Sequence, residues 1–385
     1  MKNKYLLAIS TGHAFTDMNN GALPAMLPFL IAAGGLKYTQ AAGLTFAVSI
    51  SSTLTQPLFG FMADKLSKTW FLPIGVLLAG CGLSAIGFFP DNYWIMFAAC
   101  VICGIGIAAF HPDGARLANK LAGKKKGRGM SIFTVGGTIG IGAGPLVVTP
   151  ALVYLGLKGS AVMAVPAIIM CIVFFFLIPK IQSFSEANER ILERPKVELK
   201  NEWLKFLWIS LAISCRSIFN QGLNTFLPLY WVDVLNQNKA AGGMLISLMT
   251  FTGAVVTVIG GWLADRYGMN NIIKAGWIIL IPSTFFLTFL TNPILVLLIL
   301  IPVSIGNFLV NTPLIVLGQQ YLPKNVGFAS GITLGLGVSI GGVAAPILGS
   351  YADLHGLAAT IKLLTIMPIL GILVAFTCKP PRSEN

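Results

Sequence analysis

The residues most capable of chemistry lie in a long apolar stretch near the start of the chain. His13, Asp17 and Asn20 are spaced i, i+4, i+7, so in a helix they share one face. If this stretch crosses a membrane, Asp17 lies about eleven residues inside it, or ~16 Å deep at 1.5 Å per residue. A carboxyl group at that depth is costly and marks a functional site by default. We expect Asp17 and His13 to carry a proton; the alternative is a structural pair that joins two helices.

A second polar face occurs in the other half of the chain. Arg216, Asn220 and Asn224 are spaced i, i+4, i+8, and Arg216 lies about twelve residues into its stretch, ~18 Å deep. Two opposite charges at matched depth are expected to face each other, so Arg216 either pairs with Asp17 or anchors an anionic group of the substrate. The residues expected to contact a substrate are Asn20, His111, Arg216, Asn220, Asn224, Asn307 and Asn311.

The elements that must position these residues are membrane helices. The chain is 55% hydrophobic and 10% charged, with a mean hydropathy of +0.81, whereas a soluble domain carries about a quarter charged residues. Apolar runs of about 20 residues mark membrane helices. The runs predict twelve spans, roughly at 5–32, 41–63, 70–89, 93–119, 129–155, 159–180, 203–232, 241–264, 272–290, 294–321, 327–351 and 357–378.

The spans repeat as two halves. Gly60-Phe61-Met62-Ala63-Asp64-Lys65 recurs as Gly261-Trp262-Leu263-Ala264-Asp265-Arg266, 201 residues later. Three proline positions recur at offsets of 200 or 201: Leu27-Pro28 with Leu227-Pro228, His111-Pro112 with Thr312-Pro313, and Gly144-Pro145 with Ala345-Pro346. Parallel halves are a known transporter plan. We therefore expect an all-α protein of two pseudo-symmetric six-helix bundles, 1–180 and 203–385, joined by a cytoplasmic linker, 181–202.

The glycines suggest where helices pack closely, since glycine lets backbones approach each other. We expect such approaches at the repeated loop motif, at Gly60 and Gly261. The glycine-rich run 136–145 is expected to pack against a helix of the other half. Charged residues around the loop motif and the end of the fourth span are expected to form a conformational gate: Asp64, Lys65, Lys68, Asp113, Arg116, Asp265 and Arg266.

The net charge of +13 raises the question of nucleic acid. Its placement argues against that function, because the bases fall mostly on one side of the predicted spans and no aromatic residues interleave with them. From this asymmetry we expect an inner-membrane protein with both termini on the cytoplasmic side. The run Lys124-Lys125-Lys126 is expected to lie near the lipid surface. The expected partners are a small-molecule substrate, protons and membrane lipid, with the protein acting as a monomer.

Other classes of function fit the residues poorly. Cys100 and Cys103 form a C-x-x-C spacing in the fourth span, but no histidine or second pair lies nearby in sequence, so we interpret them as small packing residues. No His-x-x-x-His or Glu-x-x-His spacing supports an intramembrane enzyme. A single buried ion pair in a duplicated chain is a poor match to a channel filter. No metal and no cofactor are expected.

The motifs resemble those of the major facilitator superfamily, and more narrowly its fosmidomycin resistance protein branch. The residues that carry the resemblance are Gly12-His13 with Asp17; Gln56-Pro57 with Gly60, Asp64 and Lys65; Leu72-Pro73-Ile74-Gly75; Phe110-His111-Pro112 with Arg116; and Ser131 to Gly137 with Gly144-Pro145-Leu146. The resemblance implies two six-helix bundles, alternating access and proton-coupled efflux. Gly144-Pro145 looks like the family's antiporter motif, although Val147 and Val148 stand where that motif has a glycine pair.

The sequence therefore predicts a secondary transporter that exports a small polar, and potentially anionic, organic compound against protons. The direction follows from the charge of the substrate. A cation would compete with the proton for Asp17, which gives antiport, whereas an anion on Arg216 would remove the counter-charge of Asp17 and favour proton co-binding. The alternative function is thus proton-coupled uptake of an organic anion.

Overall fold

The computed structural model describes residues 4–65, 70–121, 126–189 and 201–377, and all regular structure within these ranges is helical. The side chains of 63–65, 119, 126–129, 182–189, 265, 326–328, 330–331, 334–339 and 377 lie outside the description. The chain divides into two compact units, Met1–Pro195 and Lys196–Asn385. That division falls inside the predicted linker, and we describe each unit by itself.

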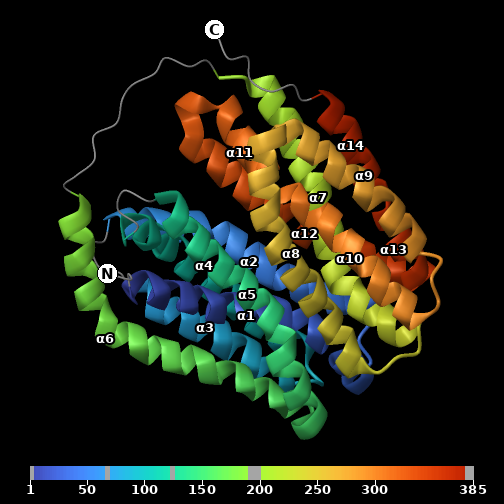
Figure 1. Ribbon diagram of the computed structural model, residues 1–385. Helices are drawn as coiled ribbons and strands as arrows, with labels where there is room; N and C mark the ends of the chain where they lie inside the picture. Colours follow the sequence, from blue (N-terminus) through green and yellow to red (C-terminus); the bar gives the residue numbers. More distant parts are fainter. Residues whose placement is uncertain (1–3, 66–69, 122–125, 190–200, 378–385) are drawn as a thin grey trace. The chain divides into compact units, whose positions relative to one another are not determined.

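The N-terminal unit contains one long helix for each of its six predicted spans (Figure 1). The elements are α1 (Lys4–Gly34), α2 (Tyr38–Lys65), α3 (Phe71–Ala85), η1 (Ile86–Phe88), α4 (Tyr93–Leu121), α5 (Lys126–Leu155), η2 (Gly156–Met163) and α6 (Ala164–Glu189). The last helix runs past the predicted start of the linker at 181, because neither glycine nor proline occurs between Lys180 and Glu189.

In the C-terminal unit, two of the six predicted spans are divided into two helices each. The elements are α7 (Trp203–Asp233), α8 (Lys239–Tyr267), α9 (Met269–Leu287), α10 (Pro293–Leu309), α11 (Asn311–Tyr321), η3 (Pro323–Asn325), α12 (Val326–His355), α13 (Leu357–Leu364) and α14 (Ile366–Thr377). Proline cannot donate to the carbonyl four residues earlier. The two breaks follow this rule, since α10 ends four residues before Pro313 and α13 ends four residues before Pro368.

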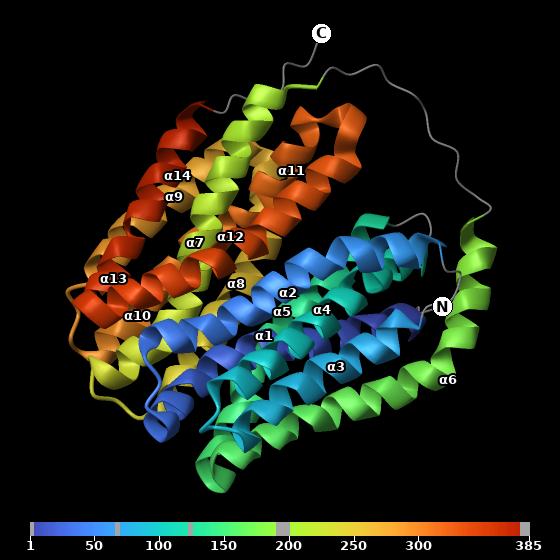
Figure 2. The ribbon, with the colours of Figure 1, turned by 180° about the vertical axis from the view of Figure 1, so that it is seen from behind.

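The two units share one topology (Figures 1 and 2). In the first, α1 packs on α5, α4 on both α2 and α3, and α3 on α6; the corresponding pairs in the second are α7 with α12, α10 with α8 and α9, and α9 with α14. Even a single helix crossing is repeated. A Cβ added to Gly75 would lie 2.8 Å from the Gly106 carbonyl oxygen, and one added to Gly276 would lie 3.1 Å from that of Gly306. These offsets of 201 and 200 residues match the sequence repeat.

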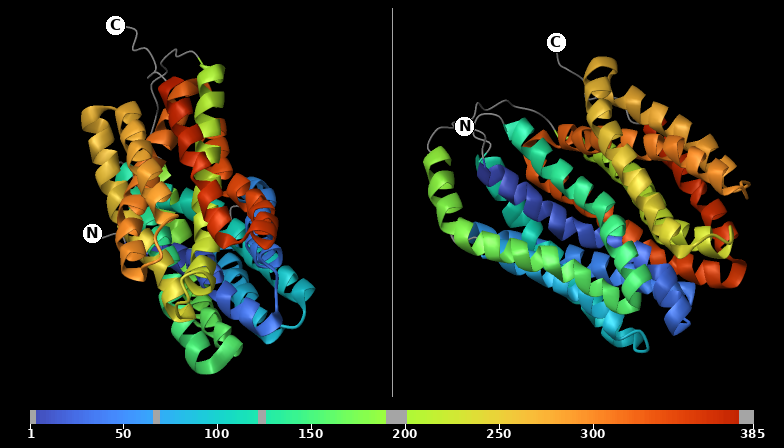
Figure 3. Two further views of the ribbon diagram at one scale, coloured as in Figure 1. Left: turned by 90° about the vertical axis from the view of Figure 1, so that its right-hand side faces the viewer. Right: turned by 60° about the horizontal axis from the view of Figure 1, so that its bottom comes forward.

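The glycine-rich face of α5 packs within its own unit. A Cβ on Gly136, Gly140 or Gly144 would collide with backbone carbonyl oxygens of α1, and Figure 3 shows α1 and α5 lying along each other. The expectation that this run faces the other half is therefore wrong. Its glycines are needed because α1 and α5 approach at backbone distance, closer than any side chain allows.

The glycines of the repeated loop motif do not mark a close helix crossing in either unit. A Cβ on Gly60 would have only Pro112 nearby, at an ordinary 3.7 Å, and one on Gly261 would meet no described atom within 4 Å. This second packing expectation is also wrong. The short contacts lie one helix further on, at the α3–α4 and α9–α10 crossings.

Length and hydropathy alone mark seven stretches of the described residues as able to cross a membrane, one of which, Met130–Ile181, spans both α5 and α6. Neither α1 nor α7 meets these criteria, because polar side chains in the middle of each helix lower its mean hydropathy. The helices α2 and α12 are not marked either, and α1 and α7 are the helices that carry the predicted Asp17 and Arg216.

Candidate functional site: a His–Asp cluster and an Arg–Asn cluster

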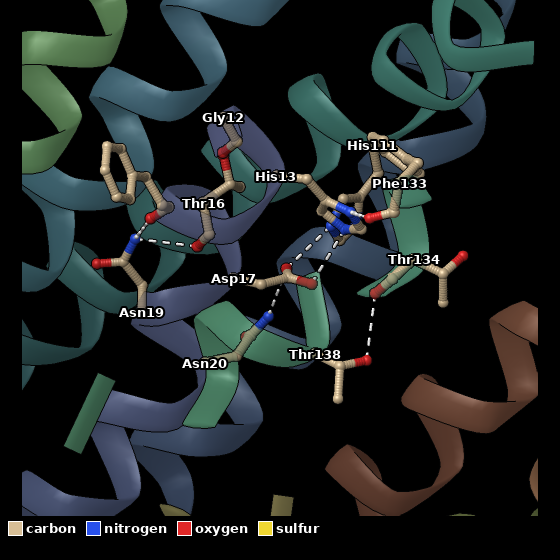
Figure 4. A network of polar contacts seen from close by, with 11 residues as sticks. Gly12, His13, Thr16, Asp17, Asn19, Asn20, His111, Phe133, Thr134 and Thr138 are labelled. Carbon is tan, nitrogen blue, oxygen red and sulfur yellow. Dashed lines mark hydrogen bonds and ion pairs between the residues drawn. The ribbon is translucent and has the colours of Figure 1, made fainter. Parts of the chain in front are cut away.

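One group of ionisable side chains lies inside the N-terminal unit, between α1 and α4 (Figure 4). His13 Nε2 is 3.1 Å from Asp17 Oδ2, one helical turn away on α1. His111 of α4 reaches the other oxygen, with its Nε2 3.0 Å from Asp17 Oδ1. Asn20 Nδ2 donates to that same oxygen at 3.2 Å. We call His13, Asp17, Asn20 and His111 the His–Asp cluster; its carboxylate has three nitrogen partners, all in one unit.

The ring of His13 is fixed on its far side by α5. Its Nδ1 lies 2.7 Å from the backbone carbonyl oxygen of Phe133. The Phe133 ring stacks on the imidazole with centroids 4.0 Å apart and planes 15° apart, and Phe110 stacks at 6.1 Å and 18°. Both ring nitrogens of His13 therefore have oxygen partners, and stacking restricts the ring to one orientation. His13 and Asp17 are both buried.

Gly137 closes the His–Asp cluster from the α5 side. A Cβ at this position would lie 2.5 Å from His13 Cε1 and 2.6 Å from Asp17 Oδ2. Any larger residue would have to displace one of these groups. Gly137, Phe133 and Phe110 belong to the site as well, although their spacing in the sequence did not predict it. The glycine run 136–145 was the available signal, but spacing within a helix does not say which neighbour its glycines face.

A second polar group lies in the C-terminal unit, between α7 and α10. Arg216 Nε donates to the backbone carbonyl oxygen of Asn307 at 3.0 Å. The Asn307 side chain donates through Nδ2 to Asn220 Oδ1 at 2.7 Å. We call Arg216, Asn220 and Asn307 the Arg–Asn cluster. All three residues were predicted, and the structure brings them together.

The Arg–Asn cluster has unused hydrogen-bonding capacity. Arg216 is 8% exposed and Asn307 is fully buried. Among side chains that the structure describes in this unit, no acceptor is present for the terminal guanidinium nitrogens, and no donor for the buried Asn307 Oδ1. Buried polar groups are normally hydrogen-bonded. Asn307 Oδ1 is an exception to this rule among the described side chains.

Two other predicted substrate residues stand outside the Arg–Asn cluster. Asn224 lies one turn beyond Asn220 on α7, and Asn311 is the first residue of α11. Both are half-buried, and neither side chain makes a hydrogen bond to another described residue.

Residues 9–346 match the family model of the Major Facilitator Superfamily. The chain belongs to this superfamily. It is therefore a multi-pass membrane transporter and not an enzyme, as the sequence predicted, and its two-bundle all-helical fold is that of the family.

The transporter is similar to proteins of differing function. It is 30% identical to an uncharacterized MFS-type transporter, YfnC, of Bacillus subtilis, and 27% identical to the fosmidomycin resistance protein of Escherichia coli; each match covers 96% of this chain and 91% of the relative. A hexuronate transporter of Escherichia coli is 22% identical over 97% of this chain and 93% of its own. The fold is similar to that of a bacterial homologue of the human lysosomal transporter Spinster, in an inward-facing and occupied conformation, with a TM-score of 0.82, 13% identity, and coverage of 99% and 98%.

The residues predicted to form the gate are described only in part. Arg116 Nη2 binds Asp113 Oδ1 at 2.7 Å within α4, and Asp113 is fully buried. Asp113 Oδ2 has no partner among the described side chains. Arg266 is exposed on α8, 5.6 Å from the centre of the Trp262 ring. The remaining gate residues lie outside the described side chains: Asp64, Lys65, Lys68 and Asp265.

The predicted pair of Asp17 and Arg216 joins residues of different units, so it stays a prediction. Within its own unit, each charge already has polar contacts: Asp17 with two histidines and an asparagine, and Arg216 with a backbone carbonyl. From the sequence, Arg216 was the one opposite charge expected at the depth of Asp17. His13 and His111, when protonated, are such charges.

His13, Asp17 and His111 also form the kind of donor set that could hold a metal, since their ligand atoms lie within 4.8 Å of one another. Two imidazoles and a carboxylate suit a transition metal. Direct hydrogen bonds between the histidine nitrogens and the carboxylate account for the same distances without an ion.

Proposed function

We propose that this protein exports a small polar organic compound across the inner membrane in exchange for protons, by alternating access. The observation that carries the proposal is the buried Asp17 carboxylate, held between two imidazoles in a membrane helix. An ionisable group in a membrane span is costly, and in transporters it marks a proton path. Histidine changes charge in the physiological range, so the His–Asp cluster is suited to take up and release one proton per cycle.

The Arg–Asn cluster is the proposed substrate site, and further proposed substrate contacts are Asn20, His111, Asn224 and Asn311. A buried guanidinium with free terminal nitrogens binds a carboxylate or a phosphorus oxyanion, because its planar fork matches their geometry. Two relatives agree with a polar substrate: one is named for fosmidomycin resistance and another for hexuronate transport.

Because the proposed proton site and the proposed substrate site lie in different units, proton binding and substrate binding can be coupled in two ways. Export in exchange for protons requires that proton binding at the His–Asp cluster and substrate binding exclude each other. Proton-coupled uptake of an organic anion is the second candidate function, and the free nitrogens of Arg216 favour it. In that mode an anion on Arg216 and a proton on the His–Asp cluster bind together, because they neutralise each other's charge.

The proposal also covers the oligomeric state of the transporter, its orientation in the membrane and its cytoplasmic gate. The transporter acts as a monomer in membrane lipid with both termini in the cytoplasm. Asp64, Lys65, Lys68, Asp265 and Arg266, together with Asp113 and Arg116, stabilise the state closed to the cytoplasm. No cofactor or metal takes part.

The test is flux in proteoliposomes that contain the purified protein and a pH-sensitive dye inside. A substrate gradient should move protons, and a pH gradient should drive substrate uphill, in both cases without effect of a metal chelator. Asp17→Asn should abolish both couplings while retaining substrate exchange at equal pH. Asp91→Asn is the matched control, because Asp91 is an exposed carboxylate outside the helices. Uphill transport by Asp17→Asn at the wild-type rate would contradict the proposal, and the sign of the proton movement decides between export and uptake.

A further inference from the structure

The contacts of His13 define how many protons the His–Asp cluster holds. Its Nδ1 is 2.7 Å from a backbone carbonyl oxygen, which only accepts, so Nδ1 must carry a hydrogen. Its Nε2 is 3.1 Å from Asp17 Oδ2. With Nδ1 already protonated, a neutral ring would turn a bare Nε2 lone pair toward the carboxylate. One further proton must therefore lie between Nε2 and Oδ2.

The other contacts of Asp17 decide which atom holds that proton. His111 and Asn20 both contact Oδ1, at 3.0 and 3.2 Å, and each can donate to it. A carboxylate that accepts several hydrogen bonds favours its ionised form. The His13 ring also stacks on the face of Phe133, with centroids 4.0 Å apart, and the negative quadrupole of that face attracts a cation. Both environments place the proton on nitrogen.

We propose that the coupling proton is carried by His13, as an imidazolium, while Asp17 remains ionised throughout the cycle as its counter-charge. This inference rests on the proposed proton coupling and assigns its carrier. The Nε2 of His111 lies 3.0 Å from the other oxygen of Asp17, Oδ1. The titratable side chains that face the His13 ring within the described part of this unit are Asp17 from α1 and His111 from α4; α5 contributes the Phe133 carbonyl and ring, and Gly137.

Loss of the proton then has a structural consequence. The Nδ1 hydrogen bond to Phe133 survives, but Nε2 becomes an acceptor opposite an acceptor, and the His13–Asp17 contact turns from attractive to repulsive. Asp17 is thereby released from one of its three partners whenever the proton leaves. Gly137 is the positioning residue for this contact, since a Cβ at this position would lie 2.5 Å from His13 Cε1 and 2.6 Å from Asp17 Oδ2.

Histidine-selective ¹⁵N spectroscopy tests the assignment directly, because the chain has only three histidines. The His13 signals are those that vanish in His13→Gln, and His355→Gln removes the ring at the end of α12. We expect both nitrogens of His13 to be protonated in the proton-loaded protein. As the pH rises, the ¹⁵N signal of His13 Nε2 should change to that of an unprotonated nitrogen over the same pH range in which gradient-driven flux changes. In the infrared spectrum, wild type and Asp17→Asn should show the same bands of protonated carboxyl groups, because Asp17 is not protonated.

Two results would overturn the assignment: a His13 ring that keeps one protonation state over that range, or a protonated-carboxyl band that titrates and is absent in Asp17→Asn. Both spectra are recorded on the purified protein and do not require a transport assay. A transporter without proton-driven flux would refute the proposed function, whereas a coupled transporter with a titrating Asp17 would refute only this inference.

Gly137→Ala tests the positioning role, and Gly136→Ala is its matched control. Both variants push a Cβ against α1, but only the first meets the His13 ring and Asp17; the second meets the Ser10 backbone. Gly137→Ala should lose the doubly protonated His13 signature and at least tenfold of pH-driven flux, while exchange of substrate at equal pH persists. Gly136→Ala should lower thermal stability and keep the wild-type His13 spectrum. Equal spectra in the two variants would show that Gly137 has no such role.

Discussion

Replacing Arg216 should remove the binding of anionic substrates while leaving neutral analogues almost unaffected. The side chain is buried, and its Nε is held by the Asn307 carbonyl at 3.0 Å, which orients the two terminal nitrogens. In the C-terminal unit those nitrogens have no acceptor among the described side chains, so their hydrogen bonds are available to a ligand.

The size of the effect follows from the number of bonds lost. A hydrogen bond to a charged group contributes about 1.5–3 kcal/mol. Arg216→Gln should remove two such bonds, or about 3–6 kcal/mol, which raises Kd by roughly 10²- to 10⁴-fold. Arg216→Lys keeps the charge but loses the fork and the Nε anchor, so Kd should rise by roughly 10- to 100-fold.

The assay is thermal unfolding of the purified protein with pairs of compounds, each a carboxylate or phosphonate and its neutral ester. A ligand at a hundred times Kd stabilises the wild type by about 2.7 kcal/mol, and a 100-fold loss of affinity reduces that to ~0.4 kcal/mol. Lys37→Gln is the control, since it removes one exposed positive charge far in sequence from the site. An anion that still stabilises Arg216→Gln as it does the wild type would refute the argument.

Three further predictions concern the pairing of charges, the gate and the packing. The effects of Asp17→Asn and Arg216→Ala on the pH dependence of transport should be non-additive if the two charges interact; additive effects would show that they do not. Asp64→Asn should shift the transporter toward the inward-open state, raising the reactivity of cysteines placed on the cytoplasmic side of the cavity; unchanged reactivity would count against a gating role. Gly140→Ala should destabilise the protein by about 1–3 kcal/mol, because its Cβ would meet an α1 backbone carbonyl, whereas Gly261→Ala, with open space, should be close to neutral in the same melting experiment.

Periodicity and repeats were enough to predict the helices and much of both clusters. The i, i+4 spacing placed His13 beside Asp17, as the 3.1 Å contact shows. Spacing could not show that His111 shares the same carboxylate, because that contact depends on how α4 packs against α1. The contact between Asn220 and Asn307 has the same origin: each residue was predicted from its own helix, and only packing joins them.

The packing errors have one physical cause. A glycine-rich helix face reports that a backbone is near, but the sequence does not say which one, so the α5 glycines were assigned to the wrong half.

The breaks at Val310 and Thr365 were missed for a different reason. Prolines occur inside other helices of this protein without ending them, so a proline alone did not mark the two that divide a span.

The close glycine crossing of α3 and α4 recurs between α9 and α10, so this part of the scaffold is common to both units. The buried charges are not repeated: at the repeat offset Asp17 corresponds to Ser217 or Ile218, and Arg216 to Thr16 or Phe15. The two units therefore share a scaffold and differ in the charge that each one buries. One unit holds the buried carboxylate of the His–Asp cluster and the other holds the buried guanidinium of the Arg–Asn cluster, so a transport cycle that uses both charges needs both units.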